Sequence, residues 1–473
     1  MPFKIGRLAS AMAFACIVCS AIGSACFCDW EQPGASDDLT ALCVVLGANP
    51  RKRARNIVRD RQGPLAEVAT WTDVYFKRQF RITRAEFAML RESIAPLIRV
   101  RDDDMARRSS PGGAVPLETK MYVTLRMLAG AMYLDMVWYG ISTEHVNEYM
   151  MEVVTAMNKC AYLDNIKLPT TEAEVRAVQE EWEELSKRRT GGISEIPGTI
   201  GAVDGYQTAI RKVSHREALS LGIQPDAFYY RKGFHALLAQ GVCNAYGQFM
   251  YWGMQWPGTT NDIVAYRQSG LADCFDAGKP MSAGHFVMDE AYSSIGGDHH
   301  LCPFSKHQLR TARARDAALY DGMLVFNNRL SSQRITVERA FGMLLRRFGI
   351  FWHDMAYSVA DTIAITTACV RLHNLGIARW RELHGARAAD TIAEAVPVFA
   401  AGHEAQANRR AAPHGAAAGD NDAAVIARVE AMANAGPVAP QRAAVRSSRR
   451  DELVQRLRQL GYRINPERRL FEF

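Results

Sequence analysis

Two apolar runs in this sequence each end on an aspartate. Residues 199–204 read TIGAVD, and residues 285–289 read HFVMD. Short apolar runs that stop at Gly or polar residues are typical of buried strands. If the two strands are neighbours in one sheet, Asp204 and Asp289 meet at its carboxyl edge. Two close carboxylates repel each other unless a cation lies between them, so this pair predicts further partners elsewhere in the chain.

The region around these strands, residues 196–380, predicts an α+β body. The turn NAYGQ at 244–248 separates two apolar runs, which is the pattern of an antiparallel hairpin. Helical periodicity follows at 332–351 and again at 361–380. Strands followed by helices in this order predict adjacent antiparallel strands with helices packed against them.

The preceding region, residues 51–195, predicts helices. Residues 117–158 predict a helix, a turn and a second helix, with Gly140 ending the first and Ser142 or Thr143 available to cap the second. This spacing occurs in helix-turn-helix motifs that read DNA and equally in any helical hairpin. Both interpretations stay open.

The charge of the chain is mildly basic, with a net charge of +7 over 473 residues. Such a charge permits nucleic-acid binding without requiring it. Six basic residues and one Asp lie within residues 51–62. This segment is either a nuclear-import or DNA-phosphate patch or a solvated helix start. Five of the ten Cys are scattered after residue 159 without paired spacing, which indicates buried free thiols in a reducing compartment.

The two ends of the chain differ from the rest in composition. Residues 1–50 contain Lys4 and Arg7 before a long apolar run, which indicates a signal peptide, an anchor helix or a leader without a targeting role. Residues 381–447 are rich in Ala, Gly and Pro and predict a disordered linker. Residues 448–473 predict a short basic helix that contacts DNA or a partner or is simply solvated.

Two further acids have both a structural and a functional interpretation. Glu338 lies on an amphipathic helix with Arg334 one turn before it, where the two side chains can form a surface ion pair. Arg334 could also reach a phosphate. Asp262 follows a Pro-Gly turn and begins a helical pattern. Its two possible roles are helix N-cap and cation ligand.

Six motifs occur in one order between residues 197 and 376. They are IGAVDGYQTAI, YYRKGFHALLAQGVCNAYGQF, WPGTTNDIVAYRQS, FVMDEAY, NNRLSSQRITVERAFGMLLRRFGI and VRLHNLGI. Together they resemble the DDE domain of PIF/Harbinger transposases and of the Harbinger transposase-derived nucleases. The resemblance implies an RNase-H-like mixed sheet flanked by helices, preceded here by the α-helical N-terminal region.

The resemblance also implies roles for individual residues. Asp204, Asp289 and Glu338 match the three catalytic acids, and Asp262 matches a fourth acid counted with them as a divalent-metal ligand. Arg231 and Lys232 match the family's basic pair that follows a Tyr, which implies contacts to DNA phosphates; Arg334 is the Arg of the family's R-x-x-x-E motif, and its own phosphate contact is expected from its place one turn before Glu338. The implied cofactor is Mg²⁺, with Mn²⁺ as the alternative.

Some neighbours of the acids depart from the family pattern. The usual Thr-His after the first acid is Tyr206-Gln207, the usual small residue after Asp262 is Ile263, and the usual Gly before the second acid is Met288. A further Gly is replaced by Ala291. These departures leave open a weakened or domesticated enzyme.

The expected function is that of a metal-dependent DNA endonuclease and transposase. Two-metal hydrolysis would nick transposon ends, and the freed 3′-hydroxyl would then attack target DNA. The alternative is a domesticated DNA-binding or interaction protein that keeps the fold without catalysis. The expected partners are DNA, a Myb-like DNA-binding protein and further copies of the chain. The expected location is the nucleus with a cytoplasmic pool, and a membrane is not expected.

Overall fold

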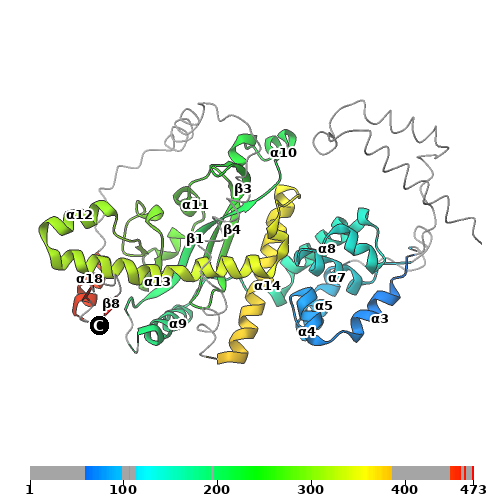
Figure 1. Cartoon of the computed structure of the whole chain (residues 1–473), viewed down its shortest axis with the longest axis horizontal. Helices are drawn as coiled ribbons and strands as arrows, with labels where there is room; N and C mark the ends of the chain where they lie inside the picture. The colour runs from blue at the N-terminus through cyan, green and yellow to red at the C-terminus, as the bar shows by residue number, and fades with distance from the viewer. Residues whose placement is uncertain are drawn as a thin grey trace, which may run out of the picture.

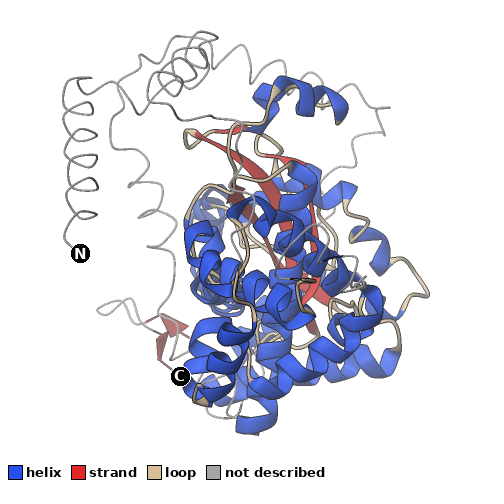
Figure 2. Ribbon diagram, turned by 90° about the vertical axis from the view of Figure 1, so that its right-hand side faces the viewer, coloured by secondary structure: helices blue, strands red, loops and turns tan. Residues whose placement is uncertain are grey.

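The computed structural model describes most of the chain after its first segment. The described residues are 59–98, 106, 113–190, 192, 195–385, 448–459, 463–464 and 471–472. The predicted leader at 1–50, residues 51–58 of the basic patch and most of the predicted linker lie outside them. A helical region leads into a sheet covered by helices on both sides (Figures 1 and 2).

The N-terminal helices form a bundle around aromatic side chains. Phe76, Phe80 and Phe87 pack against Tyr122, whose ring stacks on Phe80 and Phe87 at centroid distances of 4.8 Å. Thr83 and Glu86 form a capping box at the start of α5. The helices of the bundle are α3 Gln62–Thr70, α4 Asp73–Phe80, α5 Arg84–Ile94, α7 Leu117–Leu128 and α8 Val146–Lys159; the next helix, α9 Glu172–Thr190, packs against the sheet at β1.

The predicted helix, turn, helix at 117–158 is only partly correct. The first helix, α7, ends at Leu128, because Gly130 has φ +98° and approaches another backbone closely: a Cβ there would lie 2.8 Å from Cα of Gly349. A 3₁₀ segment, Tyr133–Tyr139, follows and ends at Gly140. The prediction of Ser142 or Thr143 as cap of the second helix is wrong, since α8 begins after His145.

The sheet is mixed, as the resemblance implies. β3 and β4 form the predicted hairpin across residues 244–248, where the Asn244 side chain accepts hydrogen bonds from the amides of Tyr246 and Gln248. The strand order is β2-β3-β1-β5-β6, with β4 also paired to β3. β1 is antiparallel to β3 and parallel to β5. The strands are β1 Thr199–Ala209, β2 Tyr229–Tyr230, β3 Phe234–Cys243, β4 Phe249–Pro257, β5 His285–Val287 and β6 His300–Leu301.

The longest helix, α13, crosses one face of this sheet (Figure 1). Its Phe341 stacks on Tyr206 of β1 at 5.3 Å and fits against Gly241 of β3, where a Cβ would lie 3.0 Å from the Phe341 ring. Tyr206, one of the departures from the family pattern, thus anchors α13 on β1. The helices of the body are α10 His215–Ser220, α11 Asp262–Gln268, α12 Lys306–Arg315, α13 Ala317–Arg347 and α14 Val359–His384.

The C-terminal helix α18, Ser448–Gln459, packs on the body. Leu453, Val454 and Leu457 are buried in the main core, and Gly322 of α13 faces Val454 closely enough that a Cβ would lie 2.9 Å away. The interpretation of this helix as simply solvated is therefore wrong, because one face is apolar and covered. Two short strands, β7 Arg463–Ile464 and β8 Phe471–Glu472, pair with each other. Among the helices that the structure describes, none combines the length and apolarity that a membrane crossing needs.

Candidate active site

The two aspartates that end apolar runs lie on adjacent parallel strands. Ala202 of β1 pairs with Val287 of β5, so Asp204 and Asp289 each lie two residues beyond this pair. The two strands are neighbours, as predicted. Asp204 is not at the end of its strand, because β1 continues to Ala209 along β3 alone. The site therefore lies where β5 stops and leaves that side of β1 open.

Arg334 of α13 lies among the three predicted catalytic acids. Its Nη1 is 2.6 Å from Oε1 of Glu338 and 4.0 Å from Oδ2 of Asp204, and its Nε is 4.0 Å from Oδ1 of Asp289. The Glu338 side chain is 26% exposed, and those of Asp204 and Asp289 are 24% and 46% exposed. Glu338 does form the ion pair with Arg334 that its spacing allows, but this pair faces the other two acids rather than open solvent.

Local hydrogen bonds orient both aspartates. Oδ1 of Asp204 accepts a hydrogen bond from the amide of Gly205 at 2.8 Å. Oδ1 of Asp289 accepts one from the amide of Glu290 at 2.8 Å, at the start of a 3₁₀ turn. Each carboxylate keeps its other oxygen for a further partner.

The electrostatics of the site disfavour an ionised Asp204. Burial raises the pKa of Asp204 to about 7; the Arg334 charge and the Gly205 amide act against this rise, while Asp262 and Asp289 add to it. Burial also raises the pKa of Asp262, with Arg231 opposing and Asp289 adding to the shift. The acids therefore lie close enough to influence one another, and a cation would stabilise their charged forms.

Asp262 approaches the site from the other face of β1. The N-cap of α11 is Asn261, whose side chain accepts a hydrogen bond from the amide of Ile263, so the interpretation of Asp262 as the cap is wrong. Asp262 instead lies over Gly205, where an added Cβ would overlap its Oδ1. The glycine beside the first acid is thus what allows the fourth acid to come near.

The residues predicted to contact phosphates lie in two different places. Arg231 and Lys232 are exposed in the turn between β2 and β3, and the Arg231 guanidinium lies 5.9 Å from the centre of the Tyr230 ring. The Arg231 charge acts on Asp262, which places this turn beside the acids. Arg334, in contrast, lies among the acids themselves.

The donor set fits a hard divalent cation by its chemistry. All the converging groups are carboxylates, and such cations prefer oxygen ligands. In the described part of the chain, no three of the acidic, His or Cys side chains are already gathered as metal ligands. Arg334 lies among Asp204, Asp289 and Glu338, so it would have to move aside for the three acids to share an ion.

Two residues near the acids were missed from the sequence. The buried Tyr292 hydroxyl donates to Oε1 of Gln240 at 3.1 Å, and the charges of Asp204, Asp262 and Asp289 all raise the pKa of Tyr292, after the larger effect of burial. Gln240 pairs with Gly205 across β1 and β3. The register between strands, which no local motif contains, brings this pair beneath the site.

Two histidines outside the acid cluster have structural contacts. His300 lies in β6 with Nε2 2.9 Å from the Tyr266 hydroxyl, and burial lowers its pKa to about 4. His299 stacks on Phe275 at 5.0 Å. Both side chains are engaged in packing, so the sequence DHH at 298–300 is not a candidate metal cluster.

The sheet order, the two aspartates on parallel neighbours and the glutamate on a crossing helix define an RNase-H-like nuclease domain. Residues 203–374 match the family described as DDE superfamily endonuclease. Curated relatives named "Putative nuclease HARBI1" are 29% identical in Bos taurus and 24% identical in Homo sapiens, each over 294 residues. Each of these two alignments covers 61% of this chain and 75% of the relative. The relative from Rattus norvegicus is 27% identical over 192 residues, which are 40% of this chain and 50% of that protein.

No solved structure matches the chain. The family match spans every acid of the site, from Asp204 to Glu338, and the curated relatives are named as nucleases. Residues 203–374 therefore form a DDE superfamily endonuclease domain, and over 61% of its length the chain is similar to relatives of the Harbinger transposase-derived nuclease type.

Proposed function

We propose that this chain is a divalent-metal-dependent DNA endonuclease of the transposase type, which hydrolyses phosphodiester bonds at transposon ends. The observation that supports this proposal is the convergence of Asp204, Asp289 and Glu338 on one guanidinium, from two parallel strands and one helix. Acids that come from three separate elements and repel one another are unfavourable for folding alone. Their convergence is useful where cations are bound.

The roles of the residues follow from their positions. Asp204, Asp289 and Glu338, with Asp262 as a further ligand, would hold Mg²⁺ or Mn²⁺. When bound there, such cations supply Lewis acidity that activates a water and stabilises the leaving 3′-oxygen. Arg334 neutralises the acids before then and, once released, can donate to a phosphate oxygen.

The DNA would approach along the exposed turn beside the acids. Arg231 and Lys232 lie on this turn and would donate to backbone phosphates without reading sequence. The freed 3′-hydroxyl would attack target DNA in a second step, in the nucleus, with a Myb-like partner and further copies of the chain. The retained acids and the family match favour this enzyme over the non-catalytic alternative.

Nicking of supercoiled plasmid tests the proposal. The native chain should nick in Mg²⁺ or Mn²⁺ and stop in EDTA, and Glu338→Gln should lower the rate by at least about a hundredfold, since metal stabilisation of the transition state is worth several kcal/mol. Asp321→Asn changes an exposed acid of the same helix and should nick normally. Nicking that survives Glu338→Gln would refute the assignment. DNA binding by a native chain that never nicks would establish the non-catalytic alternative.

A further inference from the structure

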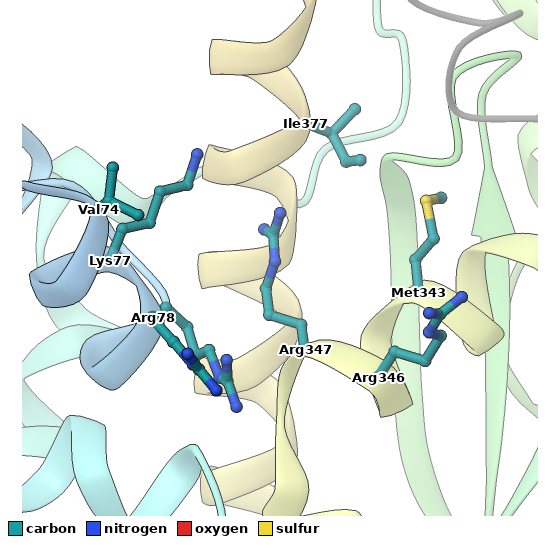
Figure 3. A pocket seen from close by; sticks show the side chains of 8 residues that line it. Val74, Lys77, Arg78, Met343, Arg346, Arg347 and Ile377 are labelled. Carbon is teal, nitrogen blue, oxygen red and sulfur yellow. The ribbon is translucent and has the colours of Figure 1, made fainter. Parts of the chain in front are cut away.

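A basic pocket of about 480 Å³ lies between the N-terminal helices and the catalytic body. Figure 3 shows side chains of α4 on one side and of the C-terminal turn of α13 on the other, beside α14. Five of the eight lining residues are basic and none is acidic. The lining residues are Val74, Lys77, Arg78, Arg81, Met343, Arg346, Arg347 and Ile377.

Helix dipoles explain each half of this pocket but not the whole. Lys77 and Arg78 lie in the last turn of α4, and Arg346 and Arg347 lie in the last turn of α13. A cation at a helix C-terminus is favourable by a few tenths to about 1 kcal/mol. That account predicts basic residues at each end separately. It does not explain why two such ends face each other, where like charges repel.

Arg81 lies in the pocket with an unusual backbone conformation and a partly buried charge. It has φ +66°, the left-handed region, and is the only non-glycine residue with positive φ in the part of the chain that the structure describes. Its Nε is buried without a hydrogen-bond partner in the protein. Burial lowers the pKa of Arg81, and the charges of Arg126 and Arg78 lower it further. A buried donor without an acceptor is costly, so an acceptor from outside the chain would stabilise it.

Arg347 is fixed at the opposite side of the pocket. Its Nη1 donates to the carbonyls of Leu372 and His373 at 3.4 and 3.2 Å, and its guanidinium lies against Gly376 of α14, where any Cβ would overlap it. Burial lowers the pKa of Arg347, and Arg81 lowers it further, while Glu86 opposes the shift.

Within the described residues, Glu86 is the carboxylate whose charge acts on Arg347. Oε2 of Glu86 accepts the amide of Thr83 in the capping box, so this carboxylate offsets the Arg347 charge only in part and with one oxygen already used. A guanidinium has five donors, and the two carbonyls of α14 use only part of them. Arg347 is therefore oriented, with donors left for a ligand.

We propose that this pocket binds a backbone phosphodiester of the DNA substrate, at a distance from the bond that is cut. Guanidinium groups donate two parallel hydrogen bonds to phosphate, which suits a site lined by four arginines and a lysine. Arg346 follows Glu338 by eight residues on α13, which is about 12 Å along the helix. That length corresponds to roughly three to four base-pair steps. The choice of DNA as the polyanion depends on the proposed function; the anion site does not.

Fluorescence polarisation with a labelled duplex, in EDTA so that no cutting occurs, tests the proposal. The double variant Lys77→Gln, Arg78→Gln removes two exposed charges from the pocket. Its apparent Kd at about 150 mM salt should rise about tenfold, and the slope of log K against log salt should fall by about one to two. The matched control, Lys306→Gln with Arg310→Gln, removes the same charges from the exposed face of α12 and should change the slope by less than about one half.

Thermal unfolding separates this proposal from a purely structural role. If these cations only complement the helix dipole, the pocket variant should melt lower than the native chain. If they form an unfilled anion site, it should melt at the same temperature or higher, because repulsion is relieved. A lower melting point with an unchanged DNA slope would overturn the proposal, as would an equal loss of slope in the control.

The outcomes also distinguish this proposal from the nuclease assignment. A native chain that never nicks, together with a pocket variant that loses salt-dependent binding, supports the pocket and contradicts the assignment. If the pocket variant nicks and binds DNA normally, the proposal that the pocket binds DNA is overturned, while the nuclease assignment stands. Stabilisation of the native chain but not the variant by inorganic phosphate, with DNA binding unaffected, identifies a small-anion site and also overturns it.

Discussion

Neutralising the first acid should stabilise the metal-free protein while abolishing its proposed activity. Burial raises the pKa of Asp204 to about 7, whereas the unfolded chain has the ordinary value of 3.8. Each unit between these pKa values is worth about 1.4 kcal/mol, so the ionised carboxylate destabilises the fold by up to about 4 kcal/mol. The side chain is 24% exposed and the amide of the variant would itself be a partly buried polar group, so we expect a gain of about 1–2 kcal/mol for Asp204→Asn.

The pH dependence of this gain follows from the direction of the shift. Below about pH 4, Asp204 is protonated in both the folded and the unfolded chain, and the variant gains nothing. Between about pH 4 and 7 the unfolded chain releases the proton that the folded chain keeps, so native stability falls as pH rises. Above about pH 7 the difference is constant and largest. The gain from the variant should therefore grow across this interval and then level.

Thermal unfolding in EDTA at about pH 4.5, 6 and 7.5 measures the effect. A gain of about 1–2 kcal/mol corresponds to roughly 3–6 °C for a domain of this size. Asp321→Asn, at an exposed position of α13, is the control and should show no such dependence on pH. A variant that melts below the native chain at the highest pH would refute this reasoning. So would a difference in melting temperature that is the same at all three pH values, because it would show that burial does not raise the pKa of Asp204.

Three further substitutions test the geometry of the two sites. Arg334→Gln leaves the acids without their cation and should lower stability in EDTA by about 1–3 kcal/mol, with recovery in about 10 mM Mg²⁺ on thermal unfolding. Gly205→Ala should push Asp262 away and reduce plasmid nicking at least about tenfold, while the melting temperature falls by only a few degrees. Gly376→Ala should displace the Arg347 guanidinium, because the added Cβ would overlap it. The slope of log K against log salt for DNA binding should then fall by roughly one. The stability gain of about 1 kcal/mol that Ala usually gives over Gly in a helix should be absent, which would confirm the displacement.

The acids could be predicted because each follows a local pattern. Asp204 and Asp289 come after apolar runs, and Glu338 has Arg334 one turn earlier on an amphipathic helix. Each pattern alone is common, and only their order along the chain indicated a shared site. The central position of Arg334 was not predicted, because an i,i+4 pair on the surface and one that faces two more acids have the same spacing.

The errors arose where distant backbones meet. Helix α7 ends at Leu128, well before its predicted turn, because Gly130 packs on Gly349 from a remote part of the sequence. Solvation was one interpretation of the C-terminal helix α18 because basic side chains dominate its composition, yet two leucines and a valine on one face are enough to bury that face. Local propensity contains neither contact.

The basic pocket was missed for a related reason. Lys77-Arg78 and Arg346-Arg347 are both visible as basic pairs after apolar residues, and each pair alone indicates only the end of a helix. Their meeting depends on how α4 docks against α13 and α14. Sequence reasoning finds charge runs readily, but it cannot tell a run that faces solvent from one that faces another run.

Helix α13 links the two unfavourable charge clusters of this protein. Near its middle, Glu338 joins two aspartates around a single guanidinium; at its end, Arg346 and Arg347 join three more cations with no lining acid. Each cluster gathers like charges, and the two have opposite sign, but at about 12 Å through screened solvent neither does much to offset the other. A phosphodiester backbone with its cations is complementary to both at once, since its phosphates fit the pocket and its bound metal fits the acids. The rigidity of one continuous helix would then fix how many base pairs separate the anchored phosphate from the one that is cut.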